Sequence, residues 1–267
     1  MSDSGAAVPA PAAGCPVTVV GGHADAVRAL FDAKAAGWPG KYAPDGRLTG
    51  RLSQFADAAG ELVAAGGELL DLGCASGELA LRLAAAGYRM TGCDIAPLML
   101  EQAAAADRRG RVSWVRLDPD WRALPFAPES LDAVISASVL EYVADPAAVL
   151  RECARVLRPG GTVLCTVPDQ THPVRWLELP LGWVARTRVA AAAGRAWPRL
   201  GRYATYLRIS RNRHRLRWWQ ATAGLAGLGP APLDRRHGAR APLRLLGFTK
   251  PAHASGPDHH DVIGGYR

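Results

Sequence analysis

The residues with the clearest chemical potential lie in residues 70–78, LDLGCASGE. Gly73 and Gly77 let the backbone approach a ligand without an intervening side chain, and the helix expected after them offers free amide donors at its positive end. Asp71 precedes both glycines, inside a short apolar strand. A carboxylate at that place suits a ligand with an ammonium group, whereas the glycine turn alone would also serve a dinucleotide. The stretch therefore predicts a site for a small ligand that carries an ammonium group.

A second acid, Asp94, ends the next expected strand, within TGCDIAPLML at 91–100. Its spacing puts it at the carboxyl end of an adjacent strand, where ligands of open α/β sheets lie and where an acid accepts both hydrogen bonds of a ribose diol. Ile95 and Met99 follow and would give a base an apolar surface. A plain core role for Ile95 and Met99 is the alternative.

The elements that must position these residues alternate along the middle of the chain. Strands are expected over 68–72, 88–93, 112–117, 131–137 and 162–167, and helices over 78–86, 97–107 and 146–157. Further helices are expected over 24–36 and 51–65, and a last strand over 243–248. Strands separated by helices of this length favour a parallel sheet with helices on both faces, an α/β doubly wound fold.

Five stretches of the sequence, in their order and spacing, resemble motifs of the class I S-adenosylmethionine-dependent methyltransferases. The matching segments are LDLGCASGE, GCDIAPLML, DWRALPF (120–126), SLDAVISASVLEYVADP and VLRPGGTVLCTVP. The resemblance implies a Rossmann-like, mostly parallel sheet of about seven strands, with N-terminal helices, a helical insertion after the fifth strand, and S-adenosyl-L-methionine as cofactor. Ala75 departs from the family, which often has glycine there. Its methyl group is small, so we expect cofactor binding to survive.

The resemblance also implies which residues hold the cofactor. Asp71 and the backbone near Gly73 and Cys74 would hold the methionine moiety, with Ala137 beside it, and Asp94 would hold the ribose. The full set expected at the cofactor is Asp71, Gly73, Cys74, Gly77, Asp94, Ile95, Met99, Asp120, Trp121 and Ala137.

For the adenine amino group, the resemblance implies Asp120, with Trp121 beside it. Asp118 stands two residues earlier and is the alternative acid. The distance to the Leu-Pro-Phe sequence that follows favours Asp120.

Methyl transfer to an alcohol or phenol needs a positioned acceptor and a group that removes its proton. The base should stand just past the fourth or fifth strand, where Glu141 (in LEYVAD) and His172 (in PDQTHP) are the two candidates. Structural roles in these loops are the alternatives. Ubiquinone-pathway O-methyltransferases resemble this stretch, but Ser138 and Tyr142 stand where some of them bind a divalent ion. We therefore expect no metal site.

Charge divides the 267-residue chain. Residues 1–170 carry 15 Lys+Arg against 20 Asp+Glu, whereas residues 171–267 carry 17 against 4. Within the segment 173–219, arginines alternate with tryptophans and tyrosines. Three interpretations stay open: a lid over an anionic acceptor, an amphipathic surface that contacts an anionic membrane or a lipid-linked acceptor, and a solvated helix whose arginines reflect codon usage. Arginines and aromatics also suit RNA, but the NPPY-like motif of base methyltransferases is absent, so we expect no nucleic-acid partner.

The expected organisation has five parts. They are a flexible arm (1–23), helices that cap the cofactor site (24–66), a cofactor-binding core (67–170), a basic aromatic helical lid or insertion (171–225), and terminal strands with a tail (226–267). Phe31, Trp38 and Tyr42 are candidates to close over the cofactor. The five cysteines are scattered without a CxxC pair, which favours a reducing cytoplasm. The uncharged runs at 4–24 and 218–233 fit neither a signal peptide nor a membrane span.

The function expected is methyl transfer from S-adenosyl-L-methionine to a small-molecule acceptor, at a hydroxyl oxygen. One alternative is a protein that binds the cofactor without methylating, either a scaffold or an enzyme of other chemistry. An RNA methyltransferase is the other alternative.

Overall fold

The computed structural model describes residues 22–43, 46, 48–185, 187, 197–233 and 242–252. The arm expected over 1–23, up to Gly21, lies outside the described residues, as do Arg186, Arg188, Arg195 and the tail from residue 253. Within the described ranges, no helix is long and apolar enough to cross a membrane.

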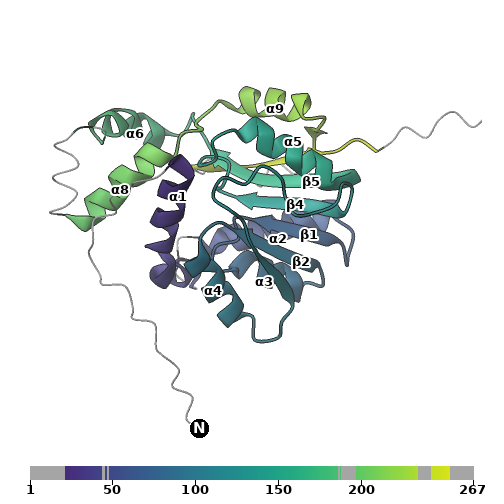
Figure 1. The fold of residues 1–267 in the computed structure, drawn as a ribbon. Coiled ribbons are helices and arrows are strands. Elements are labelled where there is room, and N and C mark those ends of the chain that lie inside the picture. The colour runs from purple at the N-terminus through teal and green to yellow at the C-terminus, as the bar shows by residue number, and fades with distance from the viewer. Residues whose placement is uncertain are drawn as a thin grey trace, which may run out of the picture.

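A seven-stranded sheet forms the centre of the molecule, in the order β3-β2-β1-β4-β5-β7-β6 (Figure 1). Its strands are β1 (Glu68–Leu72), β2 (Arg89–Asp94), β3 (Val112–Arg116), β4 (Leu131–Ala137), β5 (Leu157–Pro168), β6 (Gly229–Pro230) and β7 (Leu243–Thr249). The first five are parallel, and β7 pairs antiparallel with β5 and β6. The expected fold class, a mostly parallel Rossmann-like sheet, is confirmed.

Each face of the sheet carries its own apolar core, because successive side chains of a strand point to opposite faces. The helices α2 (Thr49–Leu62) and α3 (Glu78–Ala85) cover the face of Leu69. The helices α5 (Pro146–Val156) and α9 (Leu216–Leu225) cover the face of Leu70 and Leu72. A further helix, α4 (Pro97–Ala106), packs on β2 and β3.

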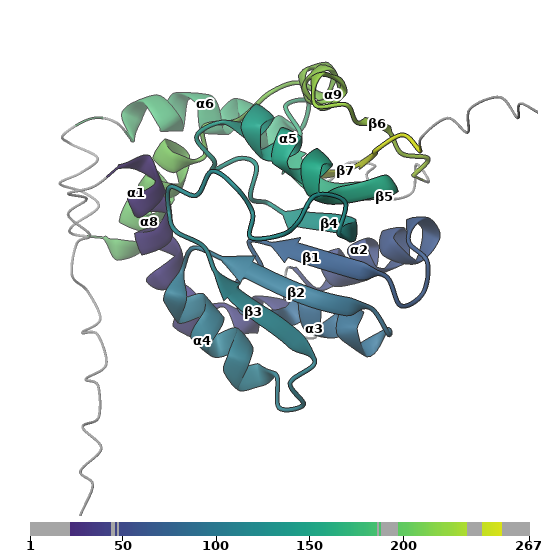
Figure 2. The same cartoon turned by 45° about the vertical axis from the view of Figure 1, so that its right-hand side comes forward.

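The helix α9 lies at the end of the segment 171–225, for which the sequence predicted a lid or insertion. It packs against α5, and its Trp219 is fully buried in the main core. The part of this segment that stands over the sheet edge consists of α6 (Pro173–Val184) and α8 (Pro198–Ile209). They lie beside α1 (His23–Asp32) at the end to which the parallel strands point (Figures 1 and 2).

β5 begins five residues earlier than the sequence predicts. Leu157 already pairs with Leu131, and the register then shifts before Ala133 pairs with Thr162. Gly160 lies within this irregular stretch and has a φ of +84°, and its N–H donates to the carbonyl of Lys250. The Pro-Gly-Gly sequence between the expected helix 146–157 and the expected strand 162–167 is therefore an irregular stretch within β5.

Trp219→Ala tests whether α9 belongs to the core. The variant leaves a large cavity in a fully buried site, so we expect the free energy of unfolding to fall by about 3–5 kcal/mol. Urea unfolding followed by circular dichroism measures it. Leu225→Ala on the same helix, 87% exposed, is the matched control and should change stability little. A loss in Trp219→Ala no larger than that of the control would contradict the core assignment.

Candidate functional site

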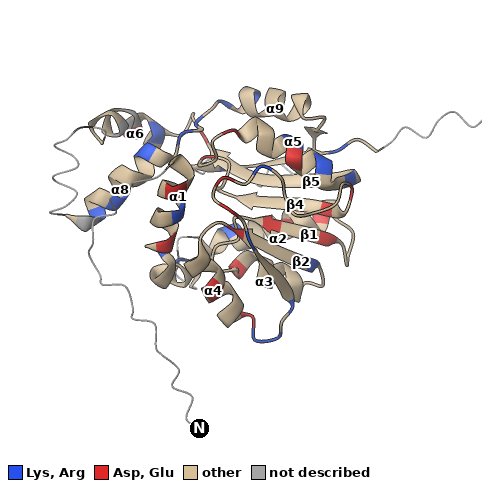
Figure 3. Ribbon diagram, in the orientation of Figure 1, with Lys and Arg blue, Asp and Glu red and all other residues tan. Residues whose placement is uncertain are grey.

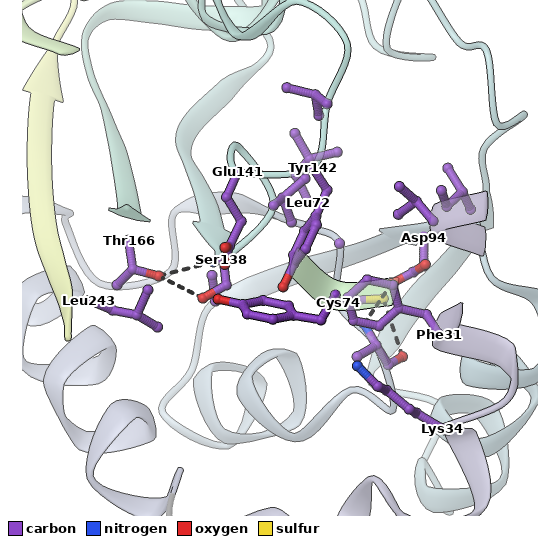
Figure 4. Close-up of a pocket in the computed structure, with 18 of the residues that line it drawn as sticks. Phe31, Lys34, Leu72, Cys74, Asp94, Ser138, Glu141, Tyr142, Thr166 and Leu243 are labelled. Atoms are coloured by element: carbon purple, nitrogen blue, oxygen red, sulfur yellow. Dashed lines mark hydrogen bonds between the residues drawn. The ribbon is translucent and has the colours of Figure 1, made fainter. Parts of the chain in front are cut away.

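A cavity of about 990 Å³ lies at the carboxyl ends of β1, β2 and β4. The sheet edge, the N-terminal helices, α6 and α8 all contribute to its wall. Its lining includes nine residues that the sequence predicted for the site: Asp71, Gly73, Cys74, Asp94, Ile95, Asp120, Trp121, Ala137 and Glu141. Gly77, Met99 and His172, also predicted, are not among the lining residues. Figure 4 shows Cys74, Asp94 and Glu141 around this space.

Asp71 is the second-last residue of β1, and its carboxylate is almost fully buried, at 1% exposure. Among the described residues, neither carboxylate oxygen has a hydrogen-bond partner of good geometry. Burial, together with the neighbouring carboxylates of Asp94 and Glu78, raises the pKa of Asp71 to about 7, although an interaction with the backbone of Ala80 acts in the opposite direction. A buried acid without a partner is costly, so this position can be satisfied by a cationic or hydrogen-donating ligand group.

The turn after β1 brings the backbone to the cavity. The N–H groups of Gly73 and Cys74 both donate to the carbonyl of Cys93, at 2.7 and 3.0 Å, which holds the turn against β2. Gly73 has a φ of +75°, and a Cβ there would collide with Val139. Ala75 has a φ of +49°, a left-handed conformation that favours glycine. The family often has glycine at this position, and glycine would adopt this backbone conformation without the strain that the Ala75 side chain introduces.

Asp94 is oriented by the backbone. Its Oδ2 accepts a hydrogen bond from the N–H of Ala75 at 2.9 Å, and its Oδ1 accepts one from the N–H of Ala96 at 2.8 Å. Burial raises the pKa of Asp94 to about 6, although these hydrogen bonds act in the opposite direction. Because each carboxylate oxygen has a second lone pair, Asp94 can still accept both hydrogens of a vicinal diol.

Gly77 and Met99 lie behind the cavity wall. Gly77 caps α3 with a φ of +84°, and a Cβ there would meet the Trp114 ring at 2.5 Å. Met99 is fully buried and packs with Ala35 and Ala96. Gly77 therefore makes room for Trp114, and Met99 takes the core role that the sequence left open as its alternative.

The two acids considered for the adenine end differ in position. Asp120 is exposed and lines the cavity, whereas Asp118 is exposed and does not. Trp121 lines the cavity and packs partly against the main core. The geometry therefore favours Asp120, as the distance to Leu-Pro-Phe does.

Glu141 projects from the loop after β4 and is 2% exposed. Its Oε2 accepts a hydrogen bond from the Ser210 hydroxyl at 2.6 Å. Burial raises the pKa of Glu141, while the hydrogen bond from Ser210 and the charges of Arg175 and Arg213 oppose that rise. The Tyr142 side chain is a further hydrogen-bond partner of this carboxylate. Glu141 is thus a buried carboxylate at the cavity wall that can exchange a proton.

His172 has a structural position in the loop after β5. Its Nδ1 accepts a hydrogen bond from the N–H of Val174 at 3.3 Å and so caps α6. Within the part of the chain that the structure describes, no group of three His, Cys, Asp or Glu side chains could hold a metal ion.

A buried ion cluster beside Glu141 escaped the sequence analysis. Glu178 Oε2 lies 2.6 Å from Arg175 Nη1 and 2.8 Å from Arg213 Nη1, and the Nη2 of Arg175 donates to the carbonyl of Pro242 at 2.8 Å. The two arginines are 38 positions apart in the chain, so no local pattern links them. The sequence nevertheless contained one indication of an ion pair, because Glu178 is the only acid among the arginines of residues 171–233.

An aromatic row crosses the cavity wall from the N-terminal helices to α8. Phe31 meets Trp38 and Tyr142 edge-on, with ring centroids 5.5 and 5.3 Å apart. Tyr142 in turn lies 6.4 Å from Tyr206, which stacks on Tyr203 at 5.9 Å. The three aromatic residues that the sequence suggested as a cover, Phe31, Trp38 and Tyr42, all line the cavity.

Comparisons with known proteins agree with this geometry. A family model described as a methyltransferase domain matches residues 70–165. The chain is 33% identical over 190 residues to the ubiquinone biosynthesis O-methyltransferase of Escherichia coli O157:H7 (strain EC4115), a match that covers 60% of this chain and 78% of that protein.

Two solved structures share the fold. The magnesium protoporphyrin IX methyltransferase of Synechocystis PCC 6803, with bound SAH, has a TM-score of 0.60 at 19% identity and covers 84% of this chain and 98% of that one. The [4+2]-cyclase SpnF has a TM-score of 0.53 at 19% identity and covers 74% and 80%.

Asp71→Asn tests how much the buried Asp71 carboxylate lowers the free energy of unfolding. With a pKa of about 7 in the folded protein against an ordinary 3.8, ionisation of Asp71 removes stability as the pH rises between these values. The ligand-free variant should therefore be more stable than the wild type at about pH 8, by on the order of a few kcal/mol, and similar to it near pH 4. Urea unfolding at both pH values measures this difference.

Asp118→Asn, on an exposed side chain outside the cavity, is the control and should keep the pH dependence of the wild type. Equal stability of Asp71→Asn and the wild type at the higher pH would show that the carboxylate carries no such cost.

Proposed function

Because the chain belongs to the class I S-adenosylmethionine-dependent methyltransferases, we propose that it transfers the methyl group to a hydroxyl oxygen of a small-molecule acceptor. The observation that carries the proposal is that one cavity contains both the acids expected at the cofactor and the buried Glu141 carboxylate. At about 990 Å³, the cavity is at the upper end of the range for ligand sites, ~300–1,000 Å³, which favours room for a cofactor and an acceptor together.

The residues present fit S-adenosyl-L-methionine. The unpartnered Asp71 carboxylate would accept the ammonium group of the methionine moiety, next to the turn at Gly73 and Cys74, with Ala137 beside it. When bound, the cofactor supplies a methyl group on a sulfonium, which is already electrophilic.

The remaining cofactor contacts follow the same edge of the sheet. Asp94 would accept the ribose hydroxyls and Ile95 would contact the base. Asp120 would accept the adenine amino group, with Trp121 against the ring system.

The work left to the protein is to position the acceptor, exclude water and remove a proton. Glu141 would take the proton of the acceptor hydroxyl, either directly or through the Tyr142 hydroxyl that is hydrogen-bonded to it. Its raised pKa brings a carboxylate closer to the working pH, which strengthens it as a base. The hydrogen bond from Ser210 keeps the carboxylate in place.

The acceptor end of the cavity favours an anionic or polar aromatic molecule. Arg175 and Arg202 line the wall formed by α6 and α8, together with the rings of Tyr203 and Tyr206. The name of the Escherichia coli relative, an O-methyltransferase of ubiquinone biosynthesis, supports oxygen as the methylated atom.

We also propose the cytoplasm as the compartment. Cys74, Cys93, Cys153 and Cys165 are buried free thiols, which are stable in a reducing environment.

Asp120→Ala tests the adenine assignment. The side chain is exposed, so the variant should fold normally and lose one hydrogen bond to the cofactor. We expect its dissociation constant for S-adenosylhomocysteine, measured by calorimetry, to rise by about three- to tenfold. Asp118→Ala is the matched control and should bind as the wild type does. The reverse result would move the adenine contact to Asp118.

Glu141→Gln tests the proposed base. We expect kcat to fall by about 10²- to 10⁴-fold with a labelled cofactor and a panel of phenols and alcohols, and the affinity for S-adenosylhomocysteine to stay unchanged. Because burial raises the pKa of Glu141, the wild-type rate should decline as the pH falls through that raised pKa, and the variant should lack this limb.

His172→Ala is measured in parallel, since that residue is the second candidate from the sequence. Full turnover in Glu141→Gln, or a loss confined to His172→Ala, would refute the assignment of Glu141. No methyl transfer to any alcohol or phenol by the wild type, despite tight cofactor binding, would favour a protein that binds the cofactor for another purpose.

A further inference from the structure

We propose that the outer face of the α6–α8 pair docks on an anionic lipid bilayer. The two helices pack against each other and project beyond the sheet edge (Figure 1). The inference concerns a surface outside the cavity and does not depend on the reaction proposed above.

The outer face exposes large apolar side chains that a protein normally buries. Trp176, Trp183 and Trp197 are 66%, 79% and 65% exposed. Val184 and Leu200 add to them, at 54% and 45% exposure. Isolated exposed apolar residues are ordinary, but two tryptophans on α6 and a third directly before α8 point to a surface that something covers.

The exposed residues of α6 follow a helical period. Trp176, Pro180, Trp183 and Val184 lie on one side of the helix, because residues three, four, seven and eight positions apart share a face. Arg175 and Glu178 lie on the opposite side and are buried. The helix is therefore amphipathic, with its apolar side turned away from the protein.

The charges around this face have one sign. Arg199 and Arg208 of α8 are exposed and do not line the cavity, and α8 has blue segments but no red one in Figure 3. Glu178, the only acid in residues 171–233, is buried between two arginines. The described part of these helices thus presents tryptophans and arginines to solvent with no exposed carboxylate among them.

An anionic bilayer complements this combination. Tryptophan partitions to the headgroup region, where its ring is apolar and its N–H is still hydrated. Arginines beside an apolar helix face add attraction to anionic lipids. A second copy of this chain would bring the same arginines together without exposed acids to balance them, so charge complementarity favours the bilayer.

The placement of the two helices also relates the surface to the cavity. The inner sides of α6 and α8 line the cavity with Val174, Arg175 and Glu178, and with Arg202, Tyr203 and Tyr206. Docking by the outer side would therefore bring the acceptor end of the cavity close to the bilayer surface.

Vesicle flotation of the full-length protein tests the proposal. We expect the wild type to float with vesicles of phosphatidylcholine and phosphatidylglycerol, and to float much less with phosphatidylcholine alone or at high salt. The double variant Trp176→Ala/Trp183→Ala should lower the affinity for the mixed vesicles by about tenfold. Arg199→Glu/Arg208→Glu should lower it by about fivefold or more.

Matched controls change the same chemistry elsewhere. Leu225→Ala removes a side chain that is 87% exposed on α9, and Arg108→Glu/Arg109→Glu makes an equal charge change after α4. Both should float as the wild type does. None of these positions lines the cavity, so every variant should bind S-adenosylhomocysteine with wild-type affinity, which checks the fold independently of methyl transfer.

Three results would overturn the proposal. They are no flotation of the wild type with the mixed vesicles, equal flotation of the two test variants and their controls, and a wild-type dimer in sedimentation velocity that Trp176→Ala/Trp183→Ala converts to monomer. The last result would assign the face to contact between copies of the chain. Loss of methyl transfer in Glu141→Gln bears on the reaction alone, so the two proposals fail separately.

Discussion

The buried Asp71 carboxylate is the constraint on which the rest of the site depends. It is the second-last residue of β1 and has no hydrogen-bond partner of good geometry among the described residues, and burial with the neighbouring carboxylates raises its pKa to about 7. The neighbouring Asp94 adds a second buried carboxylate, which the backbone holds in one orientation. Two buried acids cost folding stability. In the proposed binding mode, a cofactor with an ammonium group and a diol would offset that cost, so the site would be formed in advance at the expense of folding stability.

A second set of polar contacts joins the covering helices to the core. Glu141 accepts a hydrogen bond from Ser210, Glu178 binds Arg175 and Arg213, and Asn212 donates to the carbonyls on both sides of the loop after β4. These bonds connect residues that lie far apart in the chain. They fix the proposed base and the wall of the acceptor end in one unit, so a change in α6 or α8 acts on the geometry of Glu141 as well as on the cover.

This arrangement separates the arginines of the basic half of the chain, residues 171–267, by location. Among its described arginines, Arg175 is buried and Arg213 is half-buried, and both pair with Glu178, whereas Arg199 and Arg208 on α8 are exposed. The same two helices therefore present a polar inner side to the cavity and an apolar, basic outer side to solvent. The described arginines of residues 171–267 therefore include an internal pair that holds Glu178 and exposed residues at the surface.

The sequence by itself determined the sheet, its helices and most of the residues at the sheet edge that line the cavity, because strand, glycine turn and helix are local patterns and Asp71 and Asp94 lie inside them. Only the tertiary structure decided what depends on distant partners. Trp114 explains Gly77, the packing of Ala35 and Ala96 explains Met99, and α9 joined the core because Trp219 is buried there. The Glu141–Ser210 and Glu178–Arg213 contacts span 69 and 35 positions, and no periodicity along a chain encodes which two side chains meet once the sheet has folded.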